Sequence, residues 1–82
     1  MYLAKVYVTL KPTVNDPQGR TVMGGLKSLG FDSVADVRIG KYLEVRLGEA
    51  NRAQAEAKVK EMCDKLLANP VIEQYRYEVV EA

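Results

Sequence analysis

Histidine and tryptophan are absent from this sequence, and cysteine and phenylalanine each occur once. Histidine is the commonest general base and a frequent metal ligand, so its absence argues against most acid–base and metal sites. The single cysteine, Cys63, excludes an internal disulfide and a cysteine-rich zinc site. A lone thiol is also typical of proteins from a reducing compartment.

Long apolar runs and a strong net charge are missing as well. The apolar runs are far shorter than the roughly 18 residues of a membrane-spanning helix, and the first residues lack the pattern of a signal peptide. Twelve basic and eleven acidic side chains leave a net charge of +1, so no bulk field attracts nucleic acid or an anionic membrane. We therefore expect a cytoplasmic protein with neither of these partners.

The composition that remains is that of one small globular domain. The chain has 82 residues, of which 48% are hydrophobic and 28% are charged, and we expect a single domain over residues 1–82. A domain of this size hides only about 60% of the surface of its unfolded chain. Oligomerisation is a common supplement to the stability of such domains.

Four segments have the period-two alternation of half-buried strands. Residues 2–11 form the first strand and residues 71–80 the last. Residues 34–48 have the pattern of a hairpin, with Gly40 and Lys41 as a two-residue type II′ turn between its strands. The solvent-facing positions of these strands are polar or tyrosine, so that face could pack against another protein.

The first strand is followed by a segment with helical spacing of its apolar residues. Asp16 suits the N-cap and Pro17 the first helical position, while Gly30 supplies a left-handed residue that ends the helix. Gly24 and Gly25 lie inside this helix, where each costs roughly 1 kcal/mol relative to alanine. Close packing against the sheet would explain them, and so would a surface for a partner.

A second helix runs from an N-cap at Asn51 to about residue 68, where Asn69 and Pro70 end it. The predicted order of elements is therefore βαββαβ. This order most often gives an α+β fold, the ferredoxin-like βαββαβ sandwich, in which two helices cover one face of a four-stranded antiparallel sheet.

Chemical motifs are weak throughout. The segment from Arg38 to Lys41 resembles a phosphate loop only superficially, because its glycine lies in a turn and not before a helix. The carboxylates of the second helix are spaced to pair with lysines, and Cys63 lies on an apolar stripe without an activating base. We expect no catalytic residue, no metal site and no cofactor bound by this chain.

Several strings occur in order along the chain and closely resemble the PurS family, the small subunit of the multi-chain phosphoribosylformylglycinamidine synthase of purine biosynthesis. The resemblance covers nearly the whole chain, and its most specific part is the run from Leu66 to Glu73. Asn15 departs from it, since the family usually has an apolar residue there. The strings are Asp16-Pro17-Gln18-Gly19, Leu29-Gly30, Val37-Arg38-Ile39-Gly40-Lys41 and CDKLLANPVIEQY, residues 63–75.

This resemblance implies a non-catalytic bridging subunit that joins the ATP-dependent large synthase subunit to the glutaminase subunit and supports ammonia transfer. The large subunit would use ATP and Mg²⁺, the chain alone would have no ligase activity, and it would form a dimer or tetramer. Independently of the resemblance, the basic residues at the exposed tip of the predicted hairpin lead us to expect that Arg38 and Lys41 meet acidic groups of a partner. The candidate interface residues are Asp16, Pro17, Gln18, Gly19, Arg38, Gly40, Lys41, Asn69 and Pro70.

Two other functions share the predicted fold. An ACT-like regulatory module would bind a small effector between protomers. An enzyme resembling acylphosphatase would need an arginine in the loop after the first strand, and residues 11–16 contain none.

Overall fold

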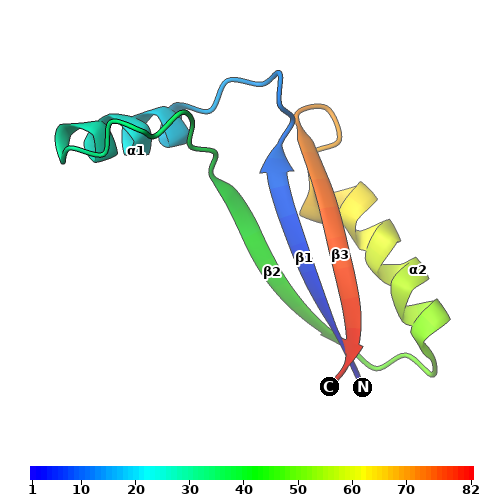
Figure 1. Ribbon diagram of the computed structural model, residues 1–82. Helices are drawn as coiled ribbons and strands as arrows, with labels where there is room; N and C mark the ends of the chain where they lie inside the picture. Colours follow the sequence, from blue (N-terminus) through cyan, green and yellow to red (C-terminus); the bar gives the residue numbers. More distant parts are fainter.

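The computed structural model describes residues 1–82. In chain order the elements are β1 (Tyr2–Leu10), α1 (Pro17–Ser28), β2 (Gly40–Leu47), α2 (Arg52–Met62), the π-helical segment η1 (Cys63–Leu67) and β3 (Glu73–Glu81). The strands form one antiparallel sheet in the order β2-β1-β3, with β1 at its centre (Figure 1). None of the helices is both long and apolar enough to span a membrane.

The predicted four-stranded ferredoxin-like sheet is wrong, because the predicted hairpin does not form. Gly40 pairs with Thr9 and Lys41 pairs with Val8, so the expected turn residues lie inside β2. Residues 34–39 have no strand partner, and the sheet has three strands. Pairing with the central strand has overridden a local turn signal, as tertiary context often does.

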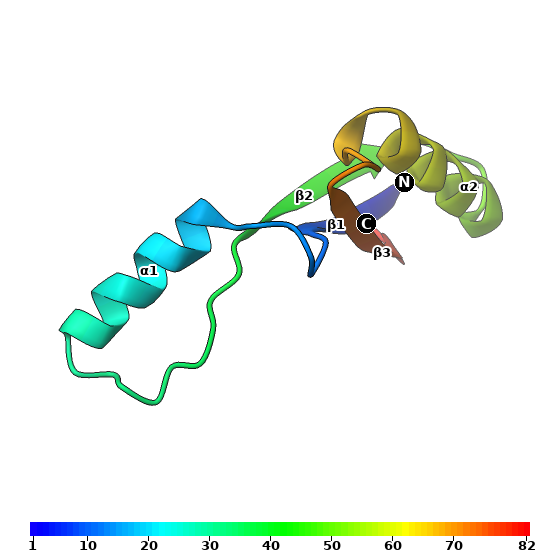
Figure 2. The same cartoon turned by 90° about the horizontal axis from the view of Figure 1, so that it is seen from above.

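α1 is also misplaced in that prediction. Figures 1 and 2 show α1 and the segment that follows it running away from the end of the sheet, side by side, so that α2 alone covers a sheet face. We call residues 17–39 the arm. The radius of gyration is 16.2 Å, whereas a compact domain of this length has about 12 Å.

The core lies between the sheet and α2. One face of β1 contributes Ala4, Val6 and Val8, and all of them are buried as the alternation predicts. Cys63 is buried in the same cluster, which confirms its predicted core position. The complete cluster consists of Ala4, Val6, Val8, Leu47, Ala55, Val59, Cys63, Ala68 and Val79.

The predicted ends of α1 are confirmed. Asp16 is the N-cap and Pro17 opens the helix. At the other end Gly30 has a φ of +96°, and the backbone N–H of Phe31 donates to the carbonyl of Leu26 at 3.0 Å. This is the bond that closes a Schellman cap.

The two glycines inside α1 have open space around them. A Cβ atom on Gly24 or Gly25 would meet no atom within 4 Å. Close packing of these glycines against the sheet of their own chain is therefore wrong. The alternative, a surface for a partner, stays a prediction.

Candidate partner interface

The predicted interface residues gather at one end of the sheet, where β1 ends and where β2 and β3 begin. Asp16, Gln18, Gly40 and Lys41 line one small surface hollow of about 200 Å³, together with Glu73 from β3. Gly19, Arg38 and Asn69 contact residues that line this hollow. Pro17 and Pro70 are chain neighbours of Asp16 and Asn69. The structure therefore brings together residues from three separate parts of the sequence.

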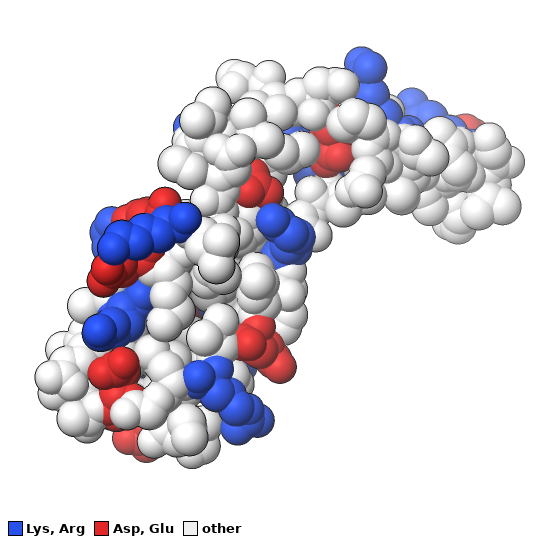
Figure 3. Space-filling model, turned by 180° about the vertical axis from the view of Figure 1, so that it is seen from behind, with Lys and Arg blue, Asp and Glu red and all other residues white.

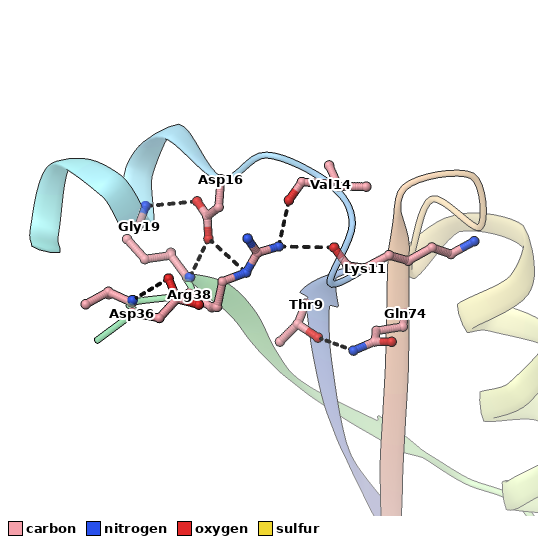
Figure 4. A network of polar contacts seen from close by, with 10 residues as sticks. Thr9, Lys11, Val14, Asp16, Gly19, Asp36, Arg38 and Gln74 are labelled. Atoms are coloured by element: carbon pink, nitrogen blue, oxygen red, sulfur yellow. Dashed lines mark hydrogen bonds and ion pairs between the residues drawn. The ribbon is translucent and has the colours of Figure 1, made fainter. Parts of the chain in front are cut away.

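Asp16 is the centre of this region (Figure 4). Its side chain is only 4% exposed, and its carboxylate accepts hydrogen bonds from the backbone N–H of Gly19 at 2.9 Å and of Ile39 at 2.7 Å. These two N–H groups, first that of Ile39, together with the nearby Arg38 guanidinium, lower the pKa of Asp16 below its ordinary value. The same carboxylate thus caps α1 and holds the start of β2.

Arg38 completes the connection. Its guanidinium donates to the carbonyl of Lys11 at 3.1 Å and to that of Val14 at 2.8 Å, and its Nε lies 4.0 Å from the Asp16 carboxylate. The loop after β1 and the segment before β2 are therefore tied at the root of the arm. We call Asp16 and Arg38 the latch.

The other predicted residues hold the loop before β3. The Lys41 ammonium lies 3.5 Å from the carboxylate of Glu73, which also accepts from the backbone N–H of Asn69 at 2.7 Å. The Lys11 ammonium donates to the carbonyl of Pro70 at 2.8 Å. Lys41 therefore has a partner within its own chain.

Gly19 and Gly40 occupy positions with no room for a side chain. A Cβ on Gly19 would collide with the carbonyl oxygen of Val37 and lie 2.9 Å from the Asp16 carboxylate. A Cβ on Gly40 would collide with the carbonyl oxygen of Val8. Gly19 allows the first turn of α1 to approach the segment that returns to the sheet, and Gly40 allows the start of β2 to approach β1.

Sequence reasoning missed Lys11 and Val14. Both take part through backbone carbonyls, and a carbonyl leaves no trace in the residue type. Glu73 was not singled out because its partners lie on other elements.

The outer face of the sheet carries a cluster of aromatic and charged side chains. The alternation of the strand residues predicts that these positions face solvent. The rings of Tyr7 and Tyr42 lie 5.0 Å apart, and the Arg76 guanidinium lies 3.9 Å from the centre of the Tyr7 ring. The hydroxyl of Tyr42 donates to Glu44 at 2.8 Å, and this bond raises the pKa of Tyr42 to about 12.

These contacts hold backbone segments together and offer little for bond-making chemistry. The Asp16 carboxylate is engaged by backbone donors, and burial raises the pKa of the Cys63 thiol, which makes it a poor nucleophile. No group of three or more histidine, cysteine, aspartate or glutamate side chains is arranged to hold a metal ion. In the view of Figure 3, most of the arm's surface is uncharged.

An arm held off the sheet, with the predicted partner residues fixed at its root, has the form of an assembly module of the α+β class. Comparisons with known proteins agree. The sequence profile of the family described as "PurS: Phosphoribosylformylglycinamidine (FGAM) synthase" matches residues 3–81. The chain belongs to the PurS family, and it is a subunit of FGAM synthase in purine biosynthesis.

Individual relatives cover the chain end to end. The PurS subunit of Bacillus subtilis is 56% identical over 81 residues, which are 99% of this chain and 95% of the relative. Its solved structure matches with a TM-score of 0.88 over 99% of this chain and 100% of that chain. The PurS structure of Methanocaldococcus jannaschii, 41% identical, also has a TM-score of 0.88, over 100% and 99% of the two chains.

A third relative comes from a structure of PurLQS from Thermotoga maritima. It is 28% identical, with a TM-score of 0.85 over 98% of this chain and 99% of that chain.

Proposed function

We propose that this chain is the bridging subunit of FGAM synthase, which joins the ATP-dependent large subunit to the glutaminase subunit and supports ammonia transfer between them. In this proposal it acts in the cytoplasm and supplies no catalytic residue, and the large subunit uses ATP and Mg²⁺. The observation that carries the proposal is the uncovered arm, whose root contains the predicted interface residues.

The surface of the protomer supports an assembly role. Its accessible surface is 5738 Å², whereas a compact protein of its mass exposes roughly 4,900 Å². Large apolar side chains remain exposed on the arm, among them Leu29 at 76% and Phe31 at 55%. Exposed apolar side chains of this kind gain stability when another surface covers them.

The reactivity of ammonia explains why a bridging subunit without catalytic residues would be needed. Ammonia becomes protonated in bulk water and is then no longer a nucleophile, so a path between two active sites must exclude solvent. A subunit can provide that shielding through shape and packing alone. Self-association as a dimer or tetramer belongs to this proposal, because a single protomer leaves its arm bare.

Two observations favour the bridging role over the ACT-like alternative. The relative from T. maritima comes from a structure of a PurLQS assembly, which supports a role among other subunits. The ACT-like alternative rested on the βαββαβ order of elements, and the protomer has three strands in place of the four of that order.

The test is assembly of the purified subunits. The large subunit and the glutaminase subunit are mixed with and without this chain, and their masses are measured by size-exclusion chromatography with light scattering. We expect a complex of all three, and no stable pair of the other two in its absence. Leu29→Asp on the arm should weaken the complex, whereas the matched change Leu29→Met keeps an apolar side chain at the same exposed position and should leave the complex intact. A stable complex that forms without this chain would contradict the proposal.

A further inference from the structure

The arm joins the sheet through two chain segments. Residues 11–16 lead out from β1 to α1, and residues 37–39 lead back from the arm to β2. α1 buries only Gly19 and makes no substantial contact with the sheet (Figure 2). The direction of the arm therefore depends on the contacts between the outgoing and the returning segment at its root.

Arg38, on the returning segment, makes most of these contacts (Figure 4). Its Nη2 atom donates to the carbonyl oxygen of Lys11 at 3.1 Å and to that of Val14 at 2.8 Å. Its Nε lies 4.0 Å from the carboxylate of Asp16. All of these groups belong to the outgoing segment. The Arg38 side chain is 34% exposed, so most of it lies against its own chain.

These contacts depend on the shape of the guanidinium more than on its charge. The two carbonyl oxygens have no net charge, and the Asp16 carboxylate already accepts bonds from the N–H groups of Gly19 and Ile39. A guanidinium is planar and points its N–H bonds in fixed directions, whereas a lysine ammonium is a single point of charge on a flexible stem. Lysine at position 38 would therefore keep the charge and lose this set of contacts.

A small change of direction at the root is amplified along the arm. α1 has 12 residues, which corresponds to a length of about 18 Å. A rotation of about 20° at the root would therefore move the far end of α1 by roughly 6 Å. Binding surfaces have to be held to within about 0.5 Å of their productive geometry. An arm that swings freely at its root would match a partner only part of the time.

We propose that Arg38 is a positioning residue, which fixes the direction of the arm through the carbonyls of Lys11 and Val14 so that the chain supports glutamine-dependent turnover. This inference rests on the bridging role in the proposed function. The guanidinium acts inside its own chain, in place of the expected contact with acidic groups of a partner. A surface that is already oriented binds more tightly, because less ordering is needed on binding.

A positioning role predicts a particular kind of defect. If an unlatched arm has the productive direction for only a fraction of the time, the apparent affinity of the chain for its partners falls by that fraction. The complex that finally forms is the same. The variant therefore needs a higher concentration to act and reaches the same maximum rate, whereas loss of a group that takes part in the transfer would lower the maximum rate.

Arg38→Lys tests the proposal, because it keeps the charge. The variant is titrated into a mixture of the large subunit and the glutaminase subunit, with glutamine as the nitrogen source. We expect its half-saturating concentration to rise roughly tenfold and its rate at saturation to stay within about twofold of the wild type. With ammonium the rate should not change. Arg20→Lys makes the same chemical change at an exposed arginine of α1 and should leave the half-saturating concentration unaltered.

Hydrogen exchange of the isolated chain reports on the latch directly. The Ile39 N–H donates to the Asp16 carboxylate at 2.7 Å, and in Arg38→Lys it should exchange roughly tenfold faster, since the root of the arm opens more often. The amides of β1, at the centre of the sheet, should exchange at the wild-type rate. They show that the variant remains folded.

Three results would overturn the inference. An Arg38→Lys chain with the wild-type half-saturating concentration would show that charge alone is sufficient, as a contact with an acidic partner requires. A lower rate at saturation would place Arg38 in the transfer itself, and unchanged exchange at Ile39 would show that Arg38 does not hold the root. Failure of the bridging role looks different, because glutamine-dependent turnover would then not depend on the wild-type chain at all.

Discussion

The Asp16 carboxylate lies 2.7 Å from the backbone nitrogen of Ile39, a residue 23 positions further along the chain. Through this bond the N-cap of α1 is also the anchor of β2. The start of the arm and its return to the sheet are therefore fixed at one point, and the direction of the arm depends on a single side chain and on Arg38 beside it.

Replacement of Asp16 by alanine should destabilise the protein and loosen the arm. The change removes the N-cap bond to Gly19 and the bond to Ile39, so we expect the melting temperature to fall by about 4–8 °C. Asp32→Ala, at an exposed turn residue of the arm, is the control and should leave it unchanged. If Asp16→Ala melts like the wild type but fails to assemble with its partners, Asp16 is a contact residue and its structural role is wrong.

The stability of the protein should depend on the ionisation of Asp16. Folding lowers the pKa of this carboxyl below its ordinary value of 3.8, so the unfolded chain binds the proton more tightly than the folded one. The stabilisation is complete above about pH 5 and is lost as the pH falls below 3.8 toward the lowered pKa of the folded state. The difference in melting temperature between the wild type and Asp16→Asn should therefore shrink from pH 6 to pH 3. A difference that stays constant over this range would contradict the assignment.

Local features of the fold could be predicted from the sequence. Asp16, Asn51 and Gly30 define helix ends through bonds to residues at most a few positions away, and the alternation in β1 and β3 identifies their buried faces. The sequence could also name candidate interface residues. It could not show which of them lie together, because a string of residue types does not give the contacts that those residues make.

The position of the arm could not be predicted in this way. Gly40-Lys41 is a good turn sequence, and only its pairing with Thr9 and Val8 makes it part of a strand. The arm's direction depends on Asp16 with Ile39 and on Arg38 with two backbone carbonyls, all of which are contacts between distant residues. Periodicity and turn propensity contain no information about such contacts.

The glycines of α1 provide a matched pair of substitutions. Gly24→Ala should raise the free energy of unfolding by about 0.5–1 kcal/mol, since alanine favours the helix and a Cβ there meets nothing in the protomer. Gly19→Ala should lower it by about 1–3 kcal/mol, because its Cβ would collide with the Val37 carbonyl. Urea denaturation measures both. Equal effects of the two substitutions would show that Gly19 is not a point of close approach.

Nitrogen-donor preference tests the bridging role most directly. The large subunit and the glutaminase subunit are assayed with ATP, Mg²⁺ and formylglycinamide ribonucleotide, with either glutamine or ammonium as the nitrogen source, in the presence and absence of this chain. We predict that ammonium supports turnover under both conditions, and that glutamine supports it only when this chain is present. Glutamine-dependent turnover that is the same without this chain would contradict the account.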